Sequence, residues 1–83
     1  MSYLRNHLKP HRRNAGLSQQ ALSSRAGISR QAYASLESGK SSPSTEVALR
    51  LARSLETTVE DLFSLAEERP GVVQADLVES ADP

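Results

Sequence analysis

The stretch "SQQALSSRAGISRQAYASLESGK", Ser18 to Lys40, contains two short segments of helical spacing that are separated by a few residues around Gly27. Ser18 and Ser29 are good N-cap residues for the two segments, and a glycine suits the left-handed position that ends a helix. Tyr33 forms an i, i+3 pair with Leu36 on the second segment, which gives that segment a side to bury. The stretch therefore predicts two short helices with a sharp turn between them.

Three further helices are predicted outside this stretch. The first opens on the i, i+4 pair Leu4 and Leu8 and stops at Gly16, with a kink or a late start near Lys9 because Pro10 is costly inside a helix. The fourth begins at Ser44 and has an apolar side made of Val47, Ala48, Leu51, Ala52 and Leu55. No strand pattern appears through Leu65. The pattern favours an all-α, five-helix fold.

The fifth helix is expected to start at Thr58. Thr58 and Asp61 resemble a capping box in which Asp replaces Glu, and Val59, Leu62 and Phe63 would face inward. From residue 67 the composition changes to an acidic stretch with a Pro-Gly breaker. We therefore expect a domain over residues 1–66 and a linker or tail over residues 67–83, which would lead to a second domain if the chain is part of a larger protein. Its fragment "VVQADLV" has some β character.

Composition narrows the chemistry that this chain can perform. Its 83 residues include no cysteine and two histidines, so the sequence offers no disulfide framework and predicts neither a metal site nor a cofactor. His7 and His11 are spaced i, i+4 but lack an evident third ligand. The sequence shows no membrane-spanning run and no signal peptide, which favours the cytoplasm. Since no nucleophile, base and acid appear in a recognisable set, we do not expect an enzyme.

Charge is distributed unevenly although the formal net charge is zero. Residues 1–53 contain nine Lys or Arg and two acids, a balance of +7, whereas residues 54–83 contain one Arg and eight acids, a balance of −7. A basic half indicates a polyanionic partner, although a solvated surface explains scattered charges as well.

The two central helices match the dimensions of a helix-turn-helix, in which the start of the second helix reaches base edges in the major groove of DNA. Arg binds guanine O6 and N7 with two hydrogen bonds, and Gln binds adenine N6 and N7 in the same way. Arg30 and Gln31 stand at that start, and Ser35 follows one turn later. These three residues are the candidate base contacts.

Residues 4–65 resemble the Cro/C1-type (lambda repressor-like, XRE family) DNA-binding domain. The matching motifs are "GLSQ" at Gly16 to Gln19, "RAGISRQ" at Arg25 to Gln31, "LESG" at Leu36 to Gly39 and "TVEDLF" at Thr58 to Phe63. Each motif alone is weak, but their joint order and spacing are specific. The resemblance implies a compact five-helix domain that binds double-stranded DNA.

The resemblance also implies roles for individual residues. The candidate phosphate contacts are Gln19, Ser29, Ser38, Lys40, Ser41, Ser42 and Ser44. Arg12 and Glu37 match an ion pair that ties the first helix to the third. The candidate dimer interface is Leu62, Phe63 and Leu65, since many relatives form dimers through the fifth helix and the segment after it. Tyr33 stands where the family usually has Ile, and we expect a core residue whose hydroxyl reaches water.

These observations predict a sequence-specific regulator of transcription that binds a palindromic operator as a homodimer through a recognition helix at residues 29–38. If the chain is the N-terminal part of a larger regulator, a small-molecule effector would bind the following domain. The alternative is a protein-interaction module, antitoxin-like or coactivator-like, on the same fold without specific DNA readout. That alternative is disfavoured because the chain keeps the residue types expected to contact DNA, at Gln19, Arg30, Gln31 and Lys40.

Overall fold

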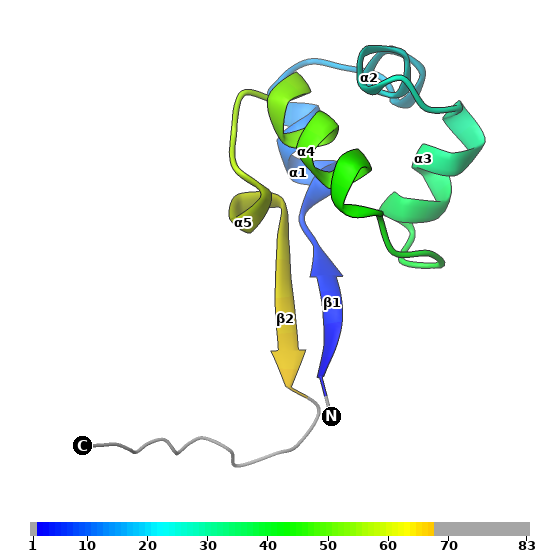
Figure 1. Cartoon of the computed structure of the whole chain (residues 1–83). Helices are drawn as coiled ribbons and strands as arrows, with labels where there is room; N and C mark the ends of the chain where they lie inside the picture. The colour runs from blue at the N-terminus through cyan, green and yellow to red at the C-terminus, as the bar shows by residue number, and fades with distance from the viewer. Residues whose placement is uncertain (1, 68–83) are drawn as a thin grey trace.

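The structure, a computed structural model, describes residues 2–67, and this range forms five helices and a two-stranded ribbon (Figure 1). The elements are β1 (Ser2–Asn6), α1 (Leu8–Asn14), α2 (Gln19–Ala26), α3 (Arg30–Glu37), α4 (Thr45–Ser54), α5 (Val59–Leu62) and β2 (Phe63–Glu67). The five predicted helices are confirmed. Within the described range, every helix is too short or too polar to cross a membrane. The predicted acidic tail and its fragment "VVQADLV" lie outside the described residues, apart from Glu67.

Side-chain caps set the starts of four helices where the sequence predicts them. The hydroxyls of Ser18, Ser29 and Ser44 accept hydrogen bonds from backbone N–H groups three residues later, at 3.0, 3.0 and 3.1 Å. Such a bond satisfies a donor that the helix itself leaves unpaired. Thr58 caps α5 in the same way, through the N–H of Asp61 at 3.1 Å. The Asp61 carboxylate in turn accepts a hydrogen bond from the Thr57 hydroxyl at 2.8 Å.

The first helix starts later than its apolar spacing suggests. It begins at Leu8, so Pro10 occupies its third position, where the missing N–H has no partner within the helix in any case. The late start near Lys9 is therefore confirmed. The assignment of Leu4 to this helix was wrong, because Leu4 lies in β1.

The ribbon contradicts the expectation that no strand precedes Leu65. β1 pairs antiparallel with β2 in a register that places Leu4 opposite Leu65 and Asn6 opposite Phe63. Figure 1 shows the two strands side by side and extending away from the helices. Their pairing joins residues about 60 positions apart, and local spacing carries no signal of such a contact.

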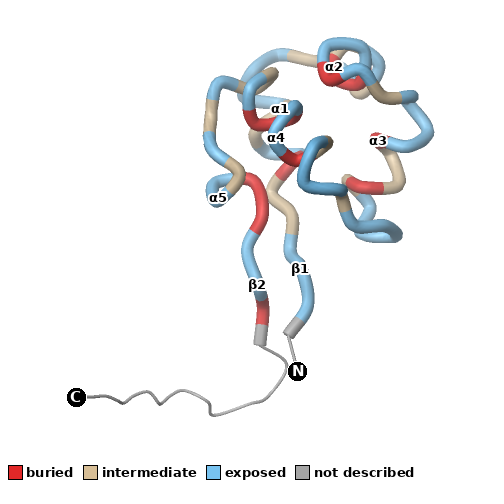
Figure 2. The backbone as a smooth tube through the Cα atoms, viewed as in Figure 1, coloured by how far each residue is buried: buried red, intermediate tan, exposed pale blue. Residues whose placement is uncertain are grey.

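The core lies where the helices meet (Figure 2). All five helices or their caps contribute to it, and its buried members are Leu8, Leu22, Ala26, Tyr33, Leu36, Ala48, Leu51, Ala52, Leu62 and Phe63. Because α2 and α3 both bury side chains in this single core, the orientation of one helix relative to the other is fixed.

Asn6 connects the ribbon to the helices. Its side-chain Nδ2 donates to the carbonyl oxygen of Leu36 at 3.1 Å, and its Oδ1 accepts from the N–H of Leu8 at 3.2 Å. The amide therefore serves both the start of α1 and the end of α3. Sequence reasoning missed this residue because its partner on α3 is 30 positions away.

Candidate nucleic-acid interface

The turn between α2 and α3 consists of Gly27, Ile28 and Ser29. Gly27 has a φ of 73°, a left-handed conformation that glycine adopts without strain. The next N–H, that of Ile28, donates to the carbonyl oxygen of Ser23 at 3.0 Å and closes the end of α2. Ser29 then caps α3 at once, so the turn is as short as a helix-turn-helix requires.

Arg30 and Gln31 form the exposed first turn of α3. The buried side of this helix carries Tyr33 and Leu36, so Gln31 points away from the core. Ser35 is half-buried, and its carbonyl oxygen accepts hydrogen bonds from the loop that follows α3. Ala34 lies one turn after Arg30 on the same side of the helix. Polar residue types alone do not reveal this position in the sequence, whereas its i, i+4 spacing from Arg30 does.

The candidate phosphate contacts on the α3–α4 loop are exposed, but several of their polar groups are already engaged. The backbone N–H groups of Lys40 and Ser41 donate to the carbonyl oxygen of Ser35 at 3.0 and 3.3 Å. Contacts from these two residues must therefore come from the side chains. The hydroxyl of Ser38 donates to the same carbonyl oxygen at 3.1 Å. Ser42 is exposed, and the Ser44 hydroxyl caps α4.

Glu37 stands at the centre of a cluster of polar side chains under this surface, which we call the Glu37 cluster: Arg12, Gln19, Tyr33 and Glu37. Arg12 Nε lies 2.9 Å from Glu37 Oε2, and the two side chains are only 13% and 8% exposed. Gln19 Nε2 donates to Oε1 at 2.8 Å, and the Tyr33 hydroxyl donates to Oε2 at 2.7 Å. The structure thus brings Arg12 and Glu37 together and adds two neutral donors.

Hydrogen bonding controls the ionisation of this cluster. Burial alone would raise the pKa of Glu37, but hydrogen bonds from Arg12, Tyr33 and Gln19 outweigh burial and lower it below the ordinary 4.5. The pKa of Tyr33 is raised, first by burial and then by its hydrogen bond to Glu37. The prediction of a water-exposed Tyr33 hydroxyl was wrong, because the side chain is fully buried and its hydroxyl binds the carboxylate.

The three candidate dimer residues lie in different environments. Leu62 and Phe63 are buried in the core of their own chain, so they offer no surface to a second copy. Leu65, in β2, is 72% exposed. Tyr3 and Leu4 in β1 are also among the exposed large apolar side chains of the described region.

His7 lies between β1 and α1 and His11 lies one turn later in α1, and each has a hydrogen-bond partner. His7 Nε2 lies 3.2 Å from the Ser64 hydroxyl, and His11 Nδ1 lies 2.9 Å from the carbonyl oxygen of His7. Within residues 2–67, no three side chains of His, Asp or Glu are grouped as a metal site would require.

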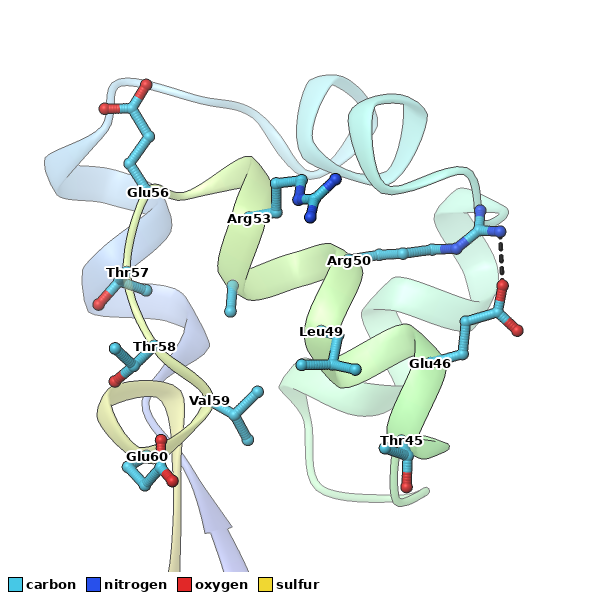
Figure 3. A pocket seen from close by; sticks show the side chains of 11 residues that line it. Thr45, Glu46, Leu49, Arg50, Arg53, Glu56, Thr57, Thr58, Val59 and Glu60 are labelled. Carbon is cyan, nitrogen blue, oxygen red and sulfur yellow. Dashed lines mark hydrogen bonds and ion pairs between the residues drawn. The ribbon is translucent and has the colours of Figure 1, made fainter.

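The largest hollow of the described surface lies away from α3. Figure 3 shows it between α4 and the segment 56–60, and its apolar members are Leu49, Ala52 and Val59. Arg50 and Glu46 form an exposed i, i+4 ion pair at its edge, at 2.6 Å. None of the candidate DNA contacts lines this hollow.

Comparisons with known proteins agree with this geometry. The helix-turn-helix family model matches residues 8–62. An uncharacterized HTH-type transcriptional regulator of Methanothermobacter thermautotrophicus is 41% identical over 66 residues, which cover 78% of this chain and 96% of the relative. The HTH-type regulator YgzD of Bacillus subtilis is 35% identical over 65 residues, which cover 78% of this chain and 98% of the relative.

Solved structures show the same fold. The restriction-modification controller protein C.AhdI from Aeromonas hydrophila superposes with a TM-score of 0.63 at 30% identity, over 65% of this chain and 82% of that protein. The biofilm regulator SinR, solved in complex with DNA, superposes with a TM-score of 0.61 at 24% identity, over 64% of this chain and 86% of that protein. Because its family model covers more than half of the sequence and its helices fold accordingly, this chain belongs to the Cro/C1-type helix-turn-helix family of DNA-binding transcriptional regulators.

Proposed function

We propose that this protein regulates transcription in the cytoplasm by binding a specific sequence of double-stranded DNA through the major groove. The observation that carries the proposal is the exposed first turn of α3, where Arg30 and Gln31 follow a three-residue turn directly. In this position Arg30 is suited to guanine and Gln31 to adenine. Ser35 and the methyl group of Ala34 lie one turn further on and would contact the neighbouring bases.

Phosphate contacts would flank these bases on both sides. Gln19 lies at the start of α2, where the helix dipole also favours a phosphate. The exposed Ser29, Ser38, Lys40, Ser41, Ser42 and Ser44 surround α3 and its following loop. These contacts would fix the position of the domain on the duplex, whereas the contacts to bases would select the sequence.

We further propose that the protein binds a palindromic operator as a homodimer, since one recognition helix reads few base pairs. The ribbon is the candidate interface. Leu4 and Leu65 are exposed opposite each other in the ladder, and a two-stranded ribbon is only marginally stable by itself. Pairing of two ribbons around a two-fold axis would bury these side chains and place two α3 helices on one duplex.

The replacement Arg30→Ala tests base readout. We expect cognate DNA to bind about 1–3 kcal/mol more weakly, with relaxed preference at one base position. The matched control is Arg53→Ala, which removes one exposed positive charge from α4 and should weaken all sequences slightly and equally. Both variants would be compared by fluorescence anisotropy on a panel of single-base operator changes. Uniform weakening by Arg30→Ala would reassign Arg30 to a phosphate.

A further inference from the structure

The Glu37 cluster contains more hydrogen bonds than an ion pair between two helices needs. Arg12 already supplies the compensating charge, with Nε at 2.9 Å and Nη2 at 3.4 Å from the two carboxylate oxygens. Gln19 and Tyr33 add two further donors, at 2.8 and 2.7 Å. One of these two, Gln19, is the first residue of α2 and is also a candidate phosphate contact. The cluster therefore joins a buried carboxylate to a candidate DNA contact.

We propose that Glu37 and the Tyr33 hydroxyl are positioning residues that orient the Gln19 amide toward a DNA phosphate. The inference rests on the proposed DNA-binding function and deepens it. A primary amide has two N–H groups that diverge from one nitrogen. Glu37 takes one of them, which leaves the second N–H of Gln19 with a fixed direction.

The two oxygens of the carboxylate have different tasks. Oε2 receives the Tyr33 hydroxyl and Arg12 Nε, and these two donors fix the plane of the carboxylate. Oε1 accepts from Gln19 Nε2 at 2.8 Å, and Arg12 Nη2 lies farther from it, at 3.4 Å. Tyr33 is suited to this task because its ring is fully buried in the core, so that the hydroxyl can move little. The core thus sets the orientation of a side chain that is itself only half-buried.

Orienting Gln19 in the free protein has two consequences for binding. The Gln19 side chain loses its rotamer entropy when the protein folds. Binding to DNA therefore does not have to order this side chain. The carboxylate would repel a phosphate if it were alone, but Arg12 neutralises it at 2.9 Å. Glu37 can therefore lie beside the DNA surface as an acceptor for Gln19 without opposing the phosphate.

A double-mutant cycle on operator affinity tests this inference. Gln19→Ala should weaken binding about tenfold, the value for one hydrogen bond to a charged group. Tyr33→Phe removes only the hydroxyl and should weaken binding by about threefold, because Gln19 loses part of its fixed orientation. In the Gln19→Ala background, Tyr33→Phe should change affinity no further. Dissociation constants would be measured by anisotropy at a temperature at which circular dichroism shows every variant to be folded.

The control is Leu51→Val, a core change on α4 that lowers stability without touching the Glu37 cluster, and it should leave affinity unchanged. Three results would overturn the inference: additive effects in the cycle, a Tyr33→Phe affinity equal to that of the control, or an unaltered affinity in Gln19→Ala. In each of these cases the wild-type protein still binds its operator, and the proposed function stands. If the wild-type protein bound no duplex specifically, the proposed function itself would fail, and the inference would fail with it.

Discussion

The α2–α3 pair and the β1–β2 ribbon hold their shapes by different means. The helix pair is defined within about 20 residues, by the caps Ser18 and Ser29 and the left-handed Gly27. The ribbon joins Ser2–Asn6 to Phe63–Glu67, and its register depends on the whole chain between them. The helix pair is therefore encoded locally, whereas the ribbon can form only after the helices have brought the two strands together.

The two regions also differ in how far their side chains are buried. In the helix pair, Tyr33 and Glu37 are packed beneath the side that carries the candidate DNA contacts, and three side chains donate hydrogen bonds to the Glu37 carboxylate. The ribbon exposes Tyr3, Leu4 and Leu65. Substitutions beneath the helix pair should therefore lower the free energy of unfolding strongly. Substitutions on the exposed side of the ribbon should weaken the association of two chains and change the stability of the single chain little.

The largest effect is expected from Arg12→Ala. The change leaves the Glu37 carboxylate buried without its charged partner and should lower the free energy of unfolding by about 3 kcal/mol. Urea denaturation followed by circular dichroism measures it. The control Glu46→Ala breaks the exposed ion pair with Arg50 and should have almost no effect. Equal losses in the two variants would show that the Arg12–Glu37 pair is no more important than a surface pair.

Acid should weaken the same cluster by a smaller amount, because protonation of Glu37 leaves no buried carboxylate charge without a partner. The pKa of Glu37 is lower in the folded state than its ordinary 4.5, so its contribution to stability is complete above about pH 4.5. That contribution is lost as the pH falls through the folded-state pKa. Urea denaturation between pH 6 and pH 3 should show this loss, and Glu37→Gln should make the profile flatter. Parallel profiles for both proteins would contradict the assignment.

Loss of the hydrogen bonds that connect the ribbon to the helices is expected to lower the free energy of unfolding by a smaller amount. Asn6→Ala removes bonds from the ribbon to the end of α3 and the start of α1, and should cost about 1–2 kcal/mol. Asn14→Ala, at an exposed position at the end of α1, is the control and should change the free energy of unfolding little. Thermal unfolding of both variants tests whether Asn6 joins the two regions.

The smallest effect on the single chain is expected from Leu65→Ser. Leu65 is 72% exposed, so the replacement should change the stability of the monomer by less than about 0.5 kcal/mol. If the ribbon forms the dimer, the same change should shift the molar mass measured by light scattering from dimer to monomer. Ser64→Ala, at an exposed neighbouring position, should leave the mass unchanged. A dimer that persists in Leu65→Ser would place the interface elsewhere.

These two regions also differ in how far sequence could predict them. The starts of α2, α3, α4 and α5 follow from Ser18, Ser29, Ser44 and Thr58, because a cap acts over three residues. The i, i+4 spacing of Leu4 and Leu8 indicated one helix, although Leu4 instead pairs with Leu65 across the ribbon. Local periodicity does not distinguish such a strand from the first turn of a helix.

The candidate site shows the same division. The exposed positions of Arg30 and Gln31 follow from helical spacing and the cap at Ser29. The contacts of Glu37 with Gln19 and Tyr33 depend on how α2 packs against α3, which spacing does not specify. The ion pair with Arg12 was expected only from the family resemblance. Residue spacing therefore does not predict side-chain networks that link several helices, and only the structure reveals them.

Selection of bound sequences from a randomised duplex library, at about 150 mM salt, tests the central claim most directly, because non-specific phosphate binding is strongly screened under these conditions. We expect enrichment of a palindrome whose half-sites contain a guanine and an adenine read by Arg30 and Gln31. Selection with Arg30→Ala should lose the preference at the guanine position alone. A wild-type protein that enriched no sequence would contradict the claim that α3 reads DNA.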